Sequence, residues 1–101
     1  MLAGFSIIPI GVGSSIGDQL AAALKIVDKS GLPYKAGAMD TVIEGEWEEI
    51  MALIKKCRDA IMEKEDRVVI SITIDDRKGK LNRIEEKLAS IEKRLGKSLR
   101  K

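Results

Sequence analysis

The chain has 101 residues, of which 45% are hydrophobic and 34% are charged, so it is long enough for one domain with a modest core and is not a disordered chain. Its net charge of +2 comes from 18 basic and 16 acidic residues, a balance that excludes the strong phosphate attraction of a nucleic-acid binder. The chain has no His, which excludes Ser-His and Cys-His catalysis and His-ligated metal sites within it.

A strand and a helix are predicted first. The apolar run Leu2–Ile10, interrupted by Pro9, predicts a largely buried strand, and its lack of a basic leader region or an uninterrupted span argues against a signal peptide or membrane segment. From Ile16, apolar side chains recur at helical spacing as far as Val27, and Ser30 with Gly31 ends this helix.

A hairpin and a second helix come next. Short strands are predicted over Tyr34–Met39 and Thr41–Gly45, with Asp40 near the turn between them. The segment Glu46–Lys64 follows as a helix, because one apolar stripe runs along it. The predicted stripe consists of Trp47, Ile50, Met51, Ile54, Cys57 and Ile61, all expected in the core.

Cys57 is the only cysteine, so no intrachain disulfide is expected, and its place in the apolar stripe predicts a small buried hydrophobe. A reducing compartment, the cytoplasm, is the simplest expectation. The abundance of Ile, Lys and Glu, with a single Gln and a single Asn, is typical of a heat-adapted (thermophile) source.

The last strand and helix complete the pattern. Arg67–Asp75 alternates Val and Ile on one face with Ser71 and Thr73 on the other, as a strand with two different faces does. A final helix from Leu81 to Leu95 carries a narrow apolar seam suited to partner helices. The order βαββαβ plus a helix predicts one α+β domain over residues 1–101, a ferredoxin-like sandwich with a four-stranded antiparallel sheet and its first two helices on one face.

Small polar side chains are expected to meet on the other face of the sheet. Ser6 on the first strand, Glu44 on the third and Ser71 with Thr73 on the last are all in phase for it. A carboxylate with several hydroxyls on a partly apolar platform suits a small polar or cationic ligand. The competing interpretation is a routine solvent face. The open face and the apolar seam also predict a homo-oligomer.

Other segments admit weaker functional interpretations. A candidate anion loop lies between the first strand and the first helix and contains Gly11, Gly13, Ser14 and Ser15; the competing interpretation is a turn with Ser14 or Ser15 as helix cap. The Glu residues at positions 44, 46, 48 and 49 fit the start of a helix, where negative charge offsets the dipole, better than a metal site.

Four segments of the chain, at residues 5–11, 30–34, 41–47 and 67–77, resemble the small thiamine-binding-protein family, and the run Thr-Val-Ile-Glu-Gly-Glu-Trp at 41–47 is the most specific of them. The resemblance implies a ferredoxin-like fold that assembles into dimers or tetramers, no catalytic activity, and binding of thiamine or its hydroxymethylpyrimidine portion near subunit contacts. Glu44 would then balance the thiazolium charge, and the hydroxyls of Ser6, Thr41, Ser71 or Thr73 would hydrogen-bond the ligand.

The leading hypothesis is therefore a non-enzymatic binder of thiamine or its precursor, acting in storage, sensing or delivery, with no further cofactor, no bound metal, and neither nucleic acid nor membrane as partner. The alternative is a ferredoxin-like regulatory or oligomerisation module that holds an amino acid or anion at residues 11–15. An enzyme with Glu44 or Asp75 as general base is the third hypothesis.

Overall fold

The computed structural model describes residues 1–11, 16–79 and 83–98. In chain order its elements are β1 (Leu2–Pro9), α1 (Ile16–Lys29), β2 (Tyr34–Ala36), β3 (Thr41–Glu44), α2 (Trp47–Met62), β4 (Val68–Asp75) and α3 (Arg83–Leu95). All the predicted elements are present. β2 is shorter than expected because the chain turns at once, with the Gly37 N–H donating to the Asp40 carbonyl at 2.8 Å.

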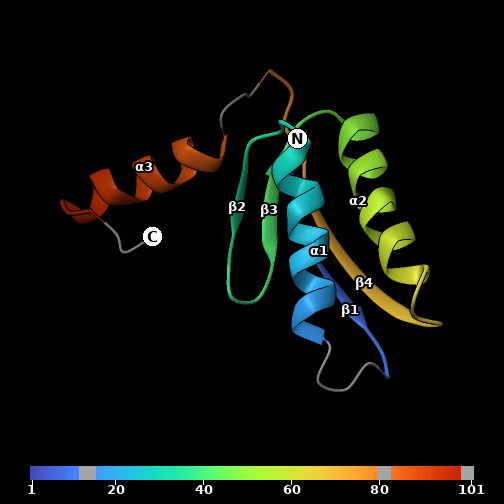
Figure 1. Cartoon of the computed structure of the whole chain (residues 1–101). Coiled ribbons are helices and arrows are strands. Elements are labelled where there is room, and N and C mark those ends of the chain that lie inside the picture. Colours follow the sequence, from blue (N-terminus) through green and yellow to red (C-terminus); the bar gives the residue numbers. More distant parts are fainter. Residues whose placement is uncertain (12–15, 80–82, 99–101) are drawn as a thin grey trace.

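The four strands form one antiparallel sheet in the order β2-β3-β1-β4. β1 is central, and it pairs with β4 from Leu2 to Pro9 but with β3 only from Leu2 to Phe5. α1 and α2 cover one face, and α3 lies on the other side of the sheet (Figure 1). This arrangement confirms the predicted ferredoxin-like α+β fold with an extra C-terminal helix.

The core lies between the sheet and the two covering helices. β1 contributes every second side chain to it, as strand geometry requires, and α1 and α2 contribute one stripe each. Its members include Ala3, Phe5, Ile7, Ala23, Val27, Ile43, Ile50, Leu53, Ile54, Cys57 and Ile61. The Cys57 Sγ contacts the Ala23 carbonyl at 3.6 Å, and burial raises the pKa of this thiol to about 11. Cys57 is thus the small buried hydrophobe that the pattern predicted.

Trp47 is not in the core, contrary to prediction, because 53% of it is exposed. The buried positions of α2 include Leu53, which the predicted stripe omitted. With 3.6 residues per turn, Trp47 lies about 60° to one side of the line through the buried positions. Helical spacing alone did not locate the centre of the buried stripe closely enough to exclude Trp47.

Candidate functional site

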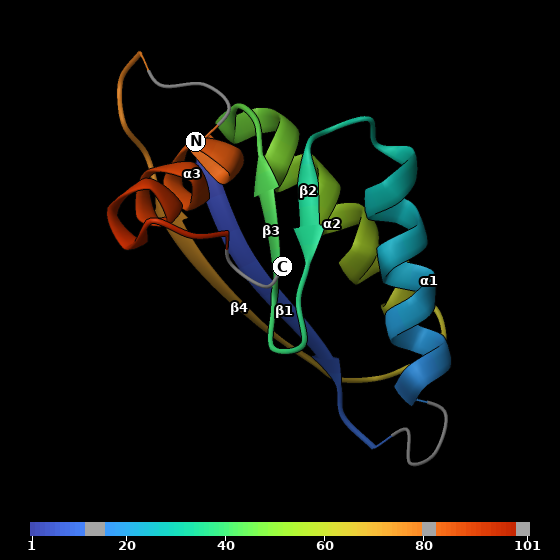
Figure 2. The ribbon, with the colours of Figure 1, turned by 90° about the vertical axis from the view of Figure 1, so that its left-hand side faces the viewer.

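The face of the sheet opposite α1 and α2, here called the open face, carries the predicted polar set. Ser6 pairs with Ser71 and Gly4 with Thr73 across β1 and β4, and directly opposed residues in an antiparallel pair point to the same face. Glu44 stands opposite Leu2 on β3 and shares that face. The structure therefore places Ser6, Glu44, Ser71 and Thr73 on one side of the sheet. Figure 2 looks onto this side of the sheet, with α3 in front of the strands.

Thr41 belongs to the other face. It pairs with Phe5, a core residue, and is itself only 8% exposed. Thr41 is the first residue of β3, at the point where the hairpin joins the sheet. Among the five residues singled out in the sequence as a ligand site, Thr41 is the one that does not lie on the open face.

Glu44 is engaged by the chain itself. It is 7% exposed, and its Oε1 accepts a hydrogen bond of 3.3 Å from the main-chain N–H of Ile84 in the first turn of α3. A carboxylate is favourable at a helix N-terminus, where N–H groups are unpaired and the dipole is positive. Glu44 thus holds the start of α3 against this end of the open face.

A pocket of about 520 Å³, here called the sheet-face pocket, lies on the open face beneath the start of α3. Residues of the sheet line it together with Ile84 and Leu88 of α3, and its charged lining residues are Lys35, Asp40 and Asp75. The lining residues are Leu2, Gly4, Lys35, Ala36, Gly37, Asp40, Val42, Thr73, Asp75, Ile84 and Leu88. A cavity of this size with a few polar groups on apolar walls is suited to a small organic ligand.

A second pocket of about 380 Å³, here called the hairpin pocket, lies where β1 runs past the end of β3. It is enclosed by the turn between β2 and β3 and by the first half of α1. The lining residues are Phe5, Ser6, Ile7, Ile8, Ile16, Leu20, Ala23, Leu24, Gly37, Ala38, Met39, Asp40 and Thr41. Ser6 and Thr41 thus line one cavity although their strand positions face opposite ways.

A third pocket of about 660 Å³ lies at the opposite end of the sheet, between the β3–α2 connection and residues 76–79. Glu44, Glu46 and Glu49 line it. The Glu46 N–H donates to Glu49 Oε1 at 3.0 Å within a reciprocal capping box, so these carboxylates start α2 as the sequence indicated. In the described part of the chain, no group of three or more Cys, Asp or Glu side chains is placed to hold a metal ion.

The predicted ligand residues are therefore divided among cavities. Thr73 lines the sheet-face pocket, Ser6 and Thr41 line the hairpin pocket, and Glu44 lines the third. Ser71 is exposed on the open face between Val69 and Thr73. Of the candidate anion loop, only Gly11 lies within the described residues, with a φ of 85° that favours glycine; Gly13, Ser14 and Ser15 lie outside them.

Asp40 was expected near the turn between β2 and β3 and was not among the predicted ligand residues. It lines both the hairpin and the sheet-face pockets, together with Gly37. A Cβ placed on Gly4 would lie 3.1 Å from the Asp40 Oδ2, so the carboxylate rests close over β1 on the open face. Gly4, in the middle of an apolar strand, was the available signal, because an isolated strand glycine often marks close approach by another group.

The described residues thus form a ferredoxin-like domain with pockets large enough for a small organic ligand. A sequence profile described as thiamine-binding protein matches residues 3–92. The chain therefore belongs to the thiamine-binding protein family, as its sequence motifs indicated.

Similar proteins support this assignment. The chain is 40% identical over 91 residues to a UPF0045 protein of Methanocaldococcus jannaschii, with 90% of this chain and 91% of that protein covered. It is 38% identical over 96 residues to a UPF0045 protein of Mycobacterium bovis, with 94% of each covered.

Solved structures agree. The crystal structure of a hypothetical protein from Methanocaldococcus jannaschii matches with a TM-score of 0.81 at 40% identity, covering 89% of this chain and 93% of that one. A "putative thiamine biosynthesis/salvage protein" from Thermotoga maritima matches with a TM-score of 0.79 at 26% identity, covering 89% and 96%. Within the described residues, no helix is both long and apolar enough to cross a bilayer.

Proposed function

We propose that this protein is a non-enzymatic binder of thiamine or of its hydroxymethylpyrimidine portion, which acts in the cytoplasm and needs no further cofactor. The family match over residues 3–92 carries the proposal. The likeness to a Thermotoga maritima protein described in terms of thiamine biosynthesis or salvage supports it. Storage, sensing and delivery all require this same step, reversible capture of the intact ligand.

The open face supplies groups that suit this ligand. Thiamine has an aminopyrimidine that forms hydrogen bonds and a positively charged thiazolium. Thr73 lines the sheet-face pocket, and Ser6 and Ser71 pair with each other across β1 and β4. In this proposal these hydroxyls orient the ligand, Thr41 does so from the hairpin pocket, and Glu44 adds negative charge while holding α3 over the site.

Isothermal titration of the purified protein with thiamine, its phosphates and hydroxymethylpyrimidine tests this function. Saturable heat with at least one of them is expected, and Thr73→Val should weaken it while Thr73→Ser, which keeps the hydroxyl, should not. No heat from any of these compounds at millimolar concentration would overturn the proposal. Consumption of the ligand during the titration would instead establish an enzyme.

We also propose that the protein works as a homodimer or homotetramer, formed through the open face and α3. Ile91 and Leu95 of α3 are 46% and 54% exposed, and Ile8 and Val69 are 44% and 42% exposed on the open face. Apolar area of this kind is normally covered by a partner. Light scattering should give a multiple of the 11.1 kDa chain mass, and Ile91→Lys with Leu95→Lys should reduce it. A monomeric wild type at high concentration contradicts the assembly.

A further inference from the structure

The hairpin pocket has an uneven distribution of charge. Of its lining residues Asp40 is the only one with a charged side chain, and the rest of the wall is apolar apart from two hydroxyls. Asp40 is exposed, and in the described part of the structure its carboxylate has neither a hydrogen bond nor an ion-pair partner. The sheet-face pocket, which it also lines, adds Lys35 and Asp75. An unpaired carboxylate at the join of two cavities attracts a positively charged group.

Gly4 leaves room for this carboxylate close to β1. Because a Cβ on Gly4 would come within 3.1 Å of the Asp40 Oδ2, an alanine there would shift the carboxylate by a few tenths of an ångström. The Asp40 carbonyl, which accepts the Gly37 N–H at 2.8 Å, anchors the turn that carries the side chain. The turn thus carries Asp40 over the central strand, and Gly4 leaves room there for its carboxylate.

The main chain of Ile7 adds polar groups beside the same cavity. In an antiparallel sheet, alternate residues of a strand direct their N–H and C=O to opposite neighbours. The Met1 carbonyl accepts from Gly45 on the β3 side, and the Ile10 N–H donates to the Arg67 carbonyl on the β4 side. The main-chain N–H and C=O groups of the odd-numbered residues of β1 therefore point toward β3. Ile7 pairs with Ile70 of β4 on its other side, but because β3 ends at Thr41, opposite Phe5, no described strand pairs with Ile7 on the β3 side.

We propose that the hairpin pocket binds the flat apolar body of an organic cation and that Asp40 is the counter-ion for its positive charge, with the Ile7 main chain as a hydrogen-bonding edge. The volume of about 380 Å³ is sufficient for an aromatic ring with its substituents. This inference deepens the proposed function, on which it rests for the identity of the ligand. It assigns the charge recognition to Asp40, because Glu44 is buried and bonded to α3.

The test compares three compounds on four proteins by titration calorimetry. The compounds are thiamine, neutral hydroxymethylpyrimidine, and N-benzylpyridinium as an aromatic cation unrelated to thiamine. The proteins are wild type, Asp40→Asn, Gly4→Ala and Glu48→Gln. Glu48 is exposed in the first turn of α2 and lines none of the three pockets, so Glu48→Gln is a control for the loss of one negative charge.

Asp40→Asn should weaken the binding of both cations about tenfold and that of hydroxymethylpyrimidine less than about twofold, because only the cations lose a charge interaction. Gly4→Ala should reproduce part of the cation effect by moving the carboxylate, without removing it. Glu48→Gln should bind like wild type. Unchanged cation affinity in Asp40→Asn, or an equal loss for the neutral compound, would overturn the inference.

The three compounds distinguish a failure of this inference from a failure of the proposed function. Thiamine binding that survives Asp40→Asn unchanged retains the function and overturns the role of Asp40. Binding of N-benzylpyridinium through Asp40, with no binding of thiamine or hydroxymethylpyrimidine, supports the pocket and overturns the function. If wild type binds none of the three compounds, both are wrong. Circular dichroism of each variant confirms that it is folded.

Discussion

The two faces of the sheet differ in what covers them, and β3 shows this within two neighbouring residues. Ile43 points toward α1 and α2 and is 0% exposed, whereas Val42 points to the open face and is only partly buried. The same alternation on β1 sends Ala3, Phe5 and Ile7 into the core and Gly4 and Ser6 to the open face. One strand therefore contributes to the core with one side and to the open face and its pockets with the other.

This difference separates substitutions into two groups. A change on the covered face removes close packing, so it should lower the free energy of unfolding with little direct effect on ligand affinity. A change on the open face alters charge and hydrogen bonding around the pockets at little cost in packing. The following predictions test this separation, from the largest expected effect to the smallest.

Ile43→Ala should lower the free energy of unfolding by about 3 kcal/mol, because it leaves a cavity in the fully packed core. Val42→Ala, its neighbour on the open face, should cost about 1 kcal/mol. Urea unfolding of both variants measures the difference. Equal losses would mean that the open face is as tightly covered in solution as the helical face.

The thiol of Cys57 gives the covered face a pH dependence. Its pKa is raised to about 11 in the folded state by burial, so the folded protein keeps its proton where the unfolded chain loses it. Its contribution to stability is complete below the unfolded-state pKa and is lost as pH rises through about 9 to 11. Between pH 8 and 11 the wild-type Tm should fall about 10 °C more than that of Cys57→Ala. Parallel curves would show that the thiol is solvated.

Glu44→Gln should release the start of α3 and leave the core intact. The substitution keeps an acceptor for the Ile84 N–H but removes the charge that favours a helix N-terminus, a loss of about 1 kcal/mol. Hydrogen exchange of the Ile84 amide should accelerate about fivefold, while amides of α2 keep their rates. Acceleration in α2 as well would show that Glu44 supports the whole fold.

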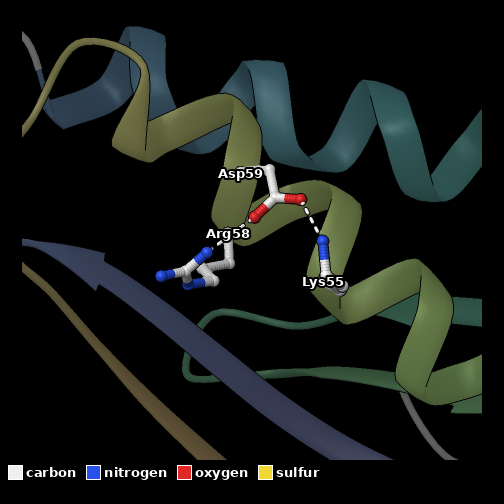
Figure 3. Close-up of polar contacts among 3 residues, drawn as sticks. All are labelled: Lys55, Arg58 and Asp59. Carbon is white, nitrogen blue, oxygen red and sulfur yellow. Dashed lines mark hydrogen bonds and ion pairs between the residues drawn. The ribbon is translucent and has the colours of Figure 1, made fainter.

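The ion pairs of α2 should contribute least. Asp59 accepts from Lys55 at 2.7 Å and from Arg58 at 2.8 Å on the helix surface (Figure 3), and the bond from Lys55, followed by that from Arg58, lowers the pKa of its carboxyl. Such pairs are well solvated, so Asp59→Asn should leave the urea midpoint at pH 7 unchanged within error. Any contribution is present above the ordinary Asp pKa and disappears as pH falls below it. A clear shift at pH 7 would assign these charges a structural role.

The spacing of apolar residues and the positions of turn-forming residues were sufficient to predict the fold. The alternation over Val68–Asp75 located β4 and its polar side correctly, and Ser30 with Gly31 ended α1 within a residue of its observed end. These features are local, because a strand or helix imposes its own repeat on the chain.

Contacts between elements that are far apart in the sequence could not be predicted from these local patterns. Alternation indicated that Glu44 shares a face with Ser6 but not that α3 returns to bond it. Asp40 was placed near the turn and not among the ligand residues, because its contact with Gly4 depends on how far β3 extends beside β1. Trp47 was predicted in the core because spacing gives a direction around a helix and not the position of the sheet beneath it.

The two halves of β1 differ in how many strands they pair with. Its first half is bonded to two neighbours and its second half, from Ser6 onward, to β4 alone. Amides near Ile7 should therefore fluctuate open at lower energy than those near Ala3. A ligand bound in the hairpin pocket would stabilise this less strongly paired half of the central strand. Ligand binding would therefore slow the local opening of this end of the sheet.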